Sequence, residues 1–138
     1  LREQAPRDLL LLAGGSGLSP MISVARAAVA SPALAGRTLH FLYGGRASRD
    51  ICGEAMLKEL PGFGERLHYH AAVSDADAAA GWTGPTGFVH ELAQSLFGDR
   101  LGDFEIYFAG PPAMAQAVQR LLHETRVPRE QVHFDEFY

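Results

Sequence analysis

The chain alternates short apolar runs with amphipathic stretches, and this alternation constrains its fold more than any other feature. The apolar runs are 9–13, 38–43, 67–73, 105–109 and 131–137. The amphipathic stretches are 20–30, 48–60, 86–96 and 114–122. Parallel strands need helix-length connections, because each crossover must return to the same end of the sheet. The pattern therefore predicts an α/β domain with a doubly wound, five-stranded parallel sheet and helices on both faces.

Local signals set the expected boundaries of the helices. Pro20 suits the first turn of a helix, because its missing N–H has no helical partner there. Ser48 is expected to cap a second helix that Pro61 ends, and Thr86 is expected to open a third. The apolar face of that third helix is expected at Val89, Leu92 and Leu96.

Composition narrows the function classes. A length of 138 residues indicates one domain, and 12 basic against 16 acidic residues give no basic face for nucleic acid. No apolar run reaches the roughly 20 residues of a membrane helix. The single cysteine, Cys52, excludes an internal disulfide and a four-cysteine iron–sulfur cluster in this chain. It favours a reducing, cytoplasmic compartment.

The glycine-rich segment between the first strand and the first helix is the most informative motif. It runs Ala13-Gly-Gly-Ser-Gly-Leu-Ser-Pro20. Glycines let the backbone approach a ligand closely, and a helix N-terminus offers free N–H groups to a pyrophosphate. Taken alone, the segment is equally well explained as a tight turn that binds nothing.

The usual dinucleotide fingerprint fits this segment only in part. Gly15 and Gly17 match its first two glycines, but Pro20 occupies the place of the third. The second strand ends in Gly44-Gly45-Arg46, where that fingerprint has an acidic residue for the ribose. An ordinary Rossmann dehydrogenase is therefore excluded, and the missing Lys-Ser/Thr pair excludes a P-loop.

Three motifs in order resemble the ferredoxin–NADP reductase superfamily. They are Gly14-Gly-Ser-Gly-Leu-Ser-Pro20, Tyr43-Gly-Gly-Arg46 and Gly110-Pro-Pro-Ala-Met114. The resemblance covers the nucleotide-binding domain of that family from end to end. The ending His133-Phe-Asp-Glu-Phe-Tyr138 is most similar to NADH-dependent reductase components of bacterial multicomponent mono- and dioxygenases.

The resemblance implies a role for each motif. The pyrophosphate would be held by Gly14, Gly15, Ser16, Gly17, Leu18, Ser19 and Pro20. Further cofactor-binding residues would be Tyr43, Gly44 and Arg46. The nicotinamide and its ribose would lie beside Ala109, Gly110, Pro111, Pro112 and Met114. Many members of the family carry a cysteine where this chain has alanine before Gly-Pro. Hydride transfer requires alignment rather than a protein nucleophile, so alanine permits it. A helix start is the alternative explanation of the two prolines.

Coenzyme choice depends on two opposing charges. NADPH-using members end the third strand in Ser-Arg, and the matching pair here is Ser74-Asp75. A carboxylate repels a 2′-phosphate and accepts hydrogen bonds from ribose hydroxyls, so Asp75 favours NADH. Arg46 favours NADPH, unless it serves instead as an ion-pair partner of Asp50. NADH is therefore predicted, with NADPH second.

The C-terminal aromatic residues have two interpretations of equal weight. In parts of the family, such residues cover the flavin face on which the nicotinamide stacks, a role that Phe137 and Tyr138 would take here. Alternatively, Phe134 and Phe137 pack the last strand.

Other candidate sites are weaker. His68 and His70 share a strand face without a third ligand, so solvent-facing side chains and no metal site are expected. Ser16 lacks the Gly-x-Ser-x-Gly context of a nucleophile elbow. Trp82 is expected to anchor its loop.

The function implied by the resemblance is hydride transfer from NADH to FAD. The FAD would be held mainly by a domain absent from this chain, so the isolated 1–138 domain is expected to be inactive. Electrons would continue to a 2Fe-2S centre and an oxygenase component. The alternatives are a flavohaemoprotein-type or other NAD(P)H:acceptor reductase, a methyltransferase of similar topology, and a non-redox nucleotide-binding module.

Overall fold

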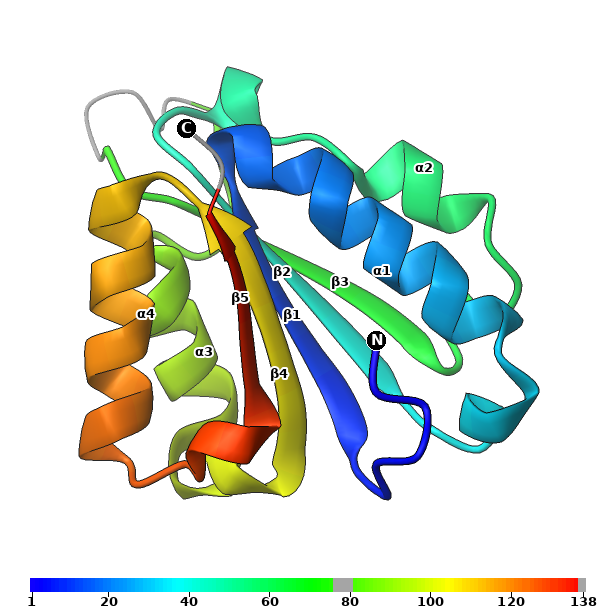
Figure 1. Cartoon of the computed structure of the whole chain (residues 1–138). Coiled ribbons are helices and arrows are strands. Elements are labelled where there is room, and N and C mark those ends of the chain that lie inside the picture. The colour runs from blue at the N-terminus through cyan, green and yellow to red at the C-terminus, as the bar shows by residue number, and fades with distance from the viewer. Residues whose placement is uncertain (76–80, 137–138) are drawn as a thin grey trace.

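A computed structural model describes residues 1–75 and 81–136 of the chain (Figure 1). Its strands are β1 (Asp8–Gly14), β2 (Leu39–Gly45), β3 (Leu67–Val73), β4 (Phe104–Gly110) and β5 (Val132–Glu136). Its α-helices are α1 (Leu18–Ala30), α2 (Glu54–Lys58), α3 (Val89–Phe97) and α4 (Pro112–Glu124). The strands pair in parallel in the order β3-β2-β1-β4-β5. The predicted five-stranded, doubly wound sheet is confirmed.

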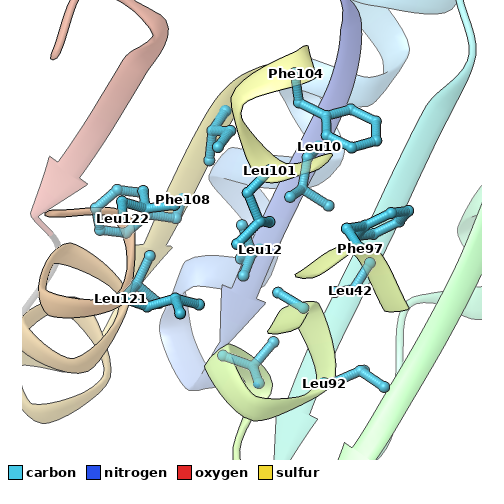
Figure 2. Packing of buried hydrophobic residues seen from close by; sticks show 14 of the residues in the cluster. Leu10, Leu12, Leu42, Leu92, Phe97, Leu101, Phe104, Phe108, Leu121 and Leu122 are labelled. Carbon is cyan, nitrogen blue, oxygen red and sulfur yellow. The ribbon is translucent and has the colours of Figure 1, made fainter. Parts of the chain in front are cut away.

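The helices cover both faces of the sheet, with α1 and α2 on one side and α3 and α4 on the other (Figure 1). Alternate residues of β1 point into the two hydrophobic cores on opposite faces of the sheet. Leu9 and Leu11 belong to the core under α1, whereas Leu10 and Leu12 belong to the core under α3 and α4 (Figure 2). A central strand buried on both faces must be apolar at every position, which explains the unbroken run of leucines. Within the described ranges, no helix is long and apolar enough to cross a membrane.

The predicted helix 48–60 is wrong as a single element. Residues Ser48–Asp50 form a 3-10 turn, and α2 is only five residues long. Gly53 separates them with φ of +93°, a left-handed conformation that an uninterrupted right-handed helix excludes. The first turn is closed by Asp50, whose Oδ2 accepts a hydrogen bond from the Ala47 N–H at 3.1 Å.

The third helix begins later than predicted and uses a different face. Thr86 bridges to Val73 of β3, and the helix starts only at Val89. Leu96 is 40% exposed, while Phe97 is buried. The buried face of the helix consists of Val89, Leu92, Ala93 and Phe97.

Three histidines lie close together on β2 and β3: His40 and His68 near the amino ends of the two strands, and His70 in the middle of β3. His40 stacks on His68 and His70, with ring centroids 5.2 and 6.1 Å apart. Phe97 and Phe104 pack edge-on against the same ring, at 4.9 and 5.8 Å. The expectation of solvent-facing histidines on an edge or rim is therefore right in part, because β3 is an edge strand of the sheet but His68 and His70 are half-buried on it. Among the described residues, no group of three or more His, Cys, Asp or Glu side chains is arranged to hold a metal ion.

Candidate functional site

A cleft of about 670 Å³ opens at the carboxyl ends of the strands. Its lining residues are Gly14, Gly15, Tyr43, Gly44, Gly45, Arg46, Asp50, Ser74, Gly87, Phe88, Val89, His90, Pro111, Ala113, Met114 and Ala117. The strand order reverses between β1 and β4, and open α/β sheets bind ligands in the crevice at such a switch point. The volume lies within the range of about 300–1,000 Å³ that is usual for ligand sites.

Gly15 and Gly17 of the first motif are required to be glycine for different structural reasons. Gly15 lines the cleft with φ of +51°, a left-handed conformation that favours glycine. Gly17 is buried, and a Cβ at this position would collide with the carbonyl carbon and oxygen of Ala109 on β4. The turn can therefore lie directly on the end of β4 only because residue 17 has no side chain.

The rest of the first motif lies beside the cleft rather than on its surface. Ser16 and Ser19 are exposed, and Pro20 is half-buried. Leu18 is also half-buried, and its Cδ1 lies 2.7 Å from the position that a Cβ on Gly53 would occupy. The structure thus places Gly14 and Gly15 on the cleft and gives Leu18 a packing contact.

The first residue of α1, Leu18, donates its N–H to the Gly15 carbonyl, and α4 begins at Pro112, which has no N–H, so the free donors of these helices start one residue later. Within the described residues, neither α1 nor α4 has a side-chain cap or an acidic residue in its first turn. In contrast, Glu91 Oε1 accepts a hydrogen bond from the Phe88 N–H at 2.8 Å and caps α3. Uncapped N–H groups and the positive ends of helix dipoles attract anions. The electrostatics of α1 and α4 therefore suit a pyrophosphate.

The end of β2 forms one wall of the cleft. A Cβ on Gly44 would lie 3.0 Å from Val89 Cβ, so the missing side chain lets the start of α3 approach β2. Burial and the neighbouring Cys52 thiol raise the pKa of Tyr43 to about 12. The buried Tyr43 hydroxyl is protonated at neutral pH, as an ordinary tyrosine is, and it lies beside the Cys52 side chain and the Gly15 backbone.

The two residues expected to select the coenzyme are brought together by pairing beyond the strands. The Ser74 N–H donates to the Gly45 carbonyl, and the Asp75 N–H donates to the Arg46 carbonyl, both at 2.9 Å. Arg46, Asp50 and Ser74 line the cleft. The Asp50 carboxylate accepts the Ala47 hydrogen bond, and no ion pair joins it to Arg46 in the part of the chain that the structure describes.

The third motif forms the opposite wall. Pro111 and Met114 line the cleft, whereas Pro112 is exposed at the first position of α4. Gly110 lies under the Met114 side chain. Ala109 is fully buried in the core under α1, so it supports the site from below.

Several lining residues were not predicted from the sequence. The most prominent is Phe88, which is 58% exposed at the rim, with its ring stacked on His90 at a centroid distance of 5.9 Å. Gly87 precedes it with φ of +120°. An aromatic residue before an apolar helix looks like a core residue in a sequence, so only the glycine gave a hint of a turn there.

Two further predictions concern the periphery. Trp82 Nε1 donates to the Pro85 carbonyl at 2.8 Å, which fits its expected role as a loop anchor. The predicted contacts of Phe137 and Tyr138 lie outside the described residues.

Comparison with known proteins gives consistent matches. Residues 11–120 match the family described as oxidoreductase NAD-binding domain. The chain is 35% identical over 132 residues to ferredoxin–NAD(P)(+) reductase CarAd of Metapseudomonas resinovorans, covering 96% of this chain and 38% of that protein. It is 31% identical over 133 residues to a subunit of the Na(+)-translocating NADH-quinone reductase of Yersinia pestis, covering 94% and 32%.

A solved structure agrees with these sequence matches. The ferredoxin reductase in carbazole 1,9a-dioxygenase superimposes with a TM-score of 0.80 at 35% identity, covering 95% of this chain and 37% of that one. The chain therefore spans less than two fifths of the length of the curated relatives named above.

Proposed function

Because the chain belongs to the family of oxidoreductase NAD-binding domains, we propose that its cleft binds NADH and orients the nicotinamide for hydride transfer to FAD. The resemblance to the ferredoxin–NADP reductase superfamily is confirmed by the family match, a curated relative and a solved structure. The observation that carries the proposal is the glycine-lined cleft at the switch point, bordered by the start of α4, whose N-terminus lacks a side-chain cap.

The residues present fit a dinucleotide. Gly14 and Gly15 leave room for the pyrophosphate beside the uncapped starts of α1 and α4. The exposed ring of Phe88 offers a flat apolar surface to the adenine at one end of the cleft. Pro111 and Met114 would border the nicotinamide and its ribose at the other end.

The chain contributes binding and orientation to the reaction. NADH supplies the hydride and FAD accepts it, so no residue of this chain needs to act as an acid, a base or a nucleophile. Backbone N–H groups would fix the phosphates, and apolar lining residues would exclude water from the ring. Alignment of this kind is worth several orders of magnitude in rate.

NADH is the proposed coenzyme. The Asp75 N–H donates to the carbonyl of Arg46, which lines the cleft, so the two residues are neighbours along the backbone at its edge. A 2′-phosphate there would encounter the negative charge of Asp75, which the hydroxyl of NADH does not. The positive charge of Arg46 would attract the 2′-phosphate and offset part of this repulsion. NADPH is therefore the second candidate coenzyme.

The wider activity extends the proposal beyond this chain. We infer that FAD is held mainly by another domain and that electrons continue to a 2Fe-2S centre and an oxygenase. The similarity to a reductase named for carbazole 1,9a-dioxygenase supports this. The similarity to part of a quinone reductase supports the alternative, a reductase that serves another acceptor. Without the flavin domain, the 138-residue chain should bind the coenzyme and fail to oxidise it.

A titration tests the coenzyme proposal directly. Saturation-transfer NMR of the chain with NADH, NADPH and AMP should give the strongest binding for NADH and weaker binding for NADPH. Stronger binding of NADPH would mean that Arg46, and not Asp75, determines the choice of coenzyme. Binding of none of the three to a folded sample would reject the cleft as a complete dinucleotide site.

A further inference from the structure

Helix α3 joins the cleft to the opposite end of the sheet. Its first residue, Val89, lines the cleft and lies close to β2, since a Cβ added to Gly44 would be 3.0 Å from Val89 Cβ. Its last residue, Phe97, packs against the ring of His40 of β2 at a centroid distance of 4.9 Å. The helix therefore contacts the same strand at both of its ends.

The lengths of the helix and the strand match between these two contacts. Val89 and Phe97 are eight residues apart, which is about 12 Å at the usual rise of an α-helix. His40 and Gly44 are four residues apart, which is about 13 Å in a strand. Along this length the buried face of α3 packs into one hydrophobic core. Because such a core is close-packed, displacement of one end of the helix also disturbs the contact at the other end.

The contact at the amino end of β2 belongs to a histidine cluster, which consists of His40, His68 and His70. The rings of His68 and His70 stack on that of His40, with centroids 5.2 and 6.1 Å from it. His40 Nδ1 is buried and has no hydrogen-bond partner among the described residues. A protonated imidazole carries an N–H on both nitrogens, so the cation would bury a donor without an acceptor. Protonation of His40 in its packed position is therefore unfavourable.

The charges around His40 add to this effect. In the described ranges, the titratable and charged groups that face it are His68, His70, Asp8 at the start of β1 and Arg100 in the 3-10 turn Gly98–Asp103. Burial is the main cause that lowers the pKa of His40, the two neighbouring histidines and Arg100 act in the same direction, and Asp8 opposes them. The Arg100 guanidinium carbon lies 5.9 Å from the centroid of the Phe97 ring. A proton on His40 would thus place a second positive charge beside that ring.

We propose that the histidine cluster is a proton-sensitive regulatory site, which on protonation displaces α3 and weakens binding of the coenzyme. This inference rests on the proposed function, because it concerns affinity for a dinucleotide. A protonated His40 is accommodated once water reaches its ring, and that requires Phe97 to withdraw. Withdrawal of Phe97 disturbs the start of α3, where Phe88, Val89 and His90 line the cleft. Protonation and coenzyme binding then favour different positions of the helix, so each weakens the other by the same factor.

Affinity for NAD⁺ at two pH values tests this coupling. NAD⁺ is the probe because, unlike NADH, it is stable in weak acid. Once α3 is displaced, His40 titrates near the ordinary histidine pKa of about 6.5, so acid favours the displaced helix. Isothermal titration should therefore give an affinity about fivefold lower at pH 5 than at pH 7. His40→Phe keeps a ring without taking up the proton, and should reduce this change to about twofold or less. An unaltered pH dependence in His40→Phe would overturn the proposal.

Two further histidine variants separate the cluster from other titrating groups. His123→Phe, at an exposed position on α4, should retain the whole change between the two pH values. His90 lines the cleft itself, so His90→Gln should alter affinity at both pH values and keep the ratio between them. A ratio that disappears in His90→Gln and persists in His40→Phe would place the titrating group in the cleft, against the proposal.

NMR of the unsubstituted chain gives a test that does not depend on how a variant folds. Saturation with NAD⁺ should lower the pKa of His40 further, as read from its ring protons. The methyl signals of Val89 should move between pH 7 and pH 5, and should stay constant in His40→Phe. If the chain binds no NAD⁺ at pH 7, the proposed function fails, and the Val89 signals still decide whether the cluster displaces α3. Constant Val89 signals in the unsubstituted chain would overturn the inference.

Discussion

The two ends of the five-stranded sheet differ in how their surfaces are filled by side chains. At the carboxyl end, β1, β2 and β4 all finish in glycine, and a cleft opens above them. At the amino end, on the face that α3 covers, His40 and its neighbours fill the surface with stacked rings. Phe97 and Phe104 from that end are visible beside the leucines of the core in Figure 2. The comparison shows that the site arises where side chains are missing.

At the amino end of the sheet, packing disfavours the protonated form of a histidine. Burial is the main reason why the pKa of His40 falls to about 4, followed by the neighbouring His68 and His70. Arg100 acts in the same direction, and Asp8 opposes it. His40 Nδ1 is buried without a hydrogen-bond partner among the described residues. The rings therefore pack well only while they are neutral.

The largest effect is expected at the carboxyl end, from Gly17→Ala. The new Cβ would strike the Ala109 carbonyl, and backbone atoms in a strand yield less easily than a side chain. We expect a loss of about 3 kcal/mol in the free energy of unfolding, measured by urea denaturation. Gly36→Ala is the matched control, since nothing lies within 4 Å of its added Cβ. A change of about 0.5 kcal/mol or less in both variants would contradict the prediction.

Acid should affect the amino end next. A histidine whose folded pKa is lowered binds its proton more readily in the unfolded chain. Stability is therefore complete above the ordinary histidine pKa near 6.5 and is lost as pH falls toward about 4. The pKa of His70 is also lowered, mainly by burial and then by His68, and adds in the same direction.

Urea unfolding at several pH values measures this loss. We expect about 2 kcal/mol from His40, allowing for its partial exposure to solvent. His40→Phe should flatten the profile between pH 6.5 and 4, whereas His123→Phe, an exposed position on α4, should leave it unchanged. An unaltered profile in His40→Phe would show that carboxylates dominate the acid response.

Coenzyme preference should respond to Asp75 by about tenfold. Asp75→Ser removes the charge that a 2′-phosphate would meet, so the ratio of NADPH to NADH affinity should rise by that factor, about 1.4 kcal/mol. Asp99→Asn, an exposed charge in the turn after α3, serves as the control. Both ratios are measured by competitive titration at one salt concentration. An unchanged ratio in Asp75→Ser would remove this residue from coenzyme selection.

The smallest effect is expected at the rim, from Phe88→Ala. Loss of a stacking surface should weaken AMP and NADH about fivefold and leave nicotinamide mononucleotide unchanged. Leu96→Ala removes another exposed apolar side chain of the α3 region, 40% exposed, and is the matched control. Isothermal titration of AMP against each variant gives the comparison. Equal effects in the two variants would mean that Phe88 does not contact the adenine.

The site was only partly predictable, and particular residues show why. Gly14, Gly15, Tyr43, Gly44, Arg46, Ser74, Pro111 and Met114 were predicted, and all of them line the cleft. They could be predicted from the sequence because they lie at the ends of strands or in motifs that occur in a fixed order along the chain. Phe88 and His90 were missed because they have no local signature. Their exposure depends on how Gly87 and Glu91 set the start of α3.

The amino-acid order by itself determined the layered fold, because a two-residue strand period, a helical period and glycine stops are local properties of the chain. It also determined which strand ends would carry the site. Only the tertiary structure decided what those glycines are for. Gly17 makes room for Ala109, and Gly14 and Gly110 make room for Met114. Just beyond the ends of β2 and β3, the Asp75 N–H donates to the Arg46 carbonyl. Apart from Gly110 and Met114, which are four residues apart, each contact joins segments distant in sequence. Close packing, unlike periodicity, is a property that no single segment possesses.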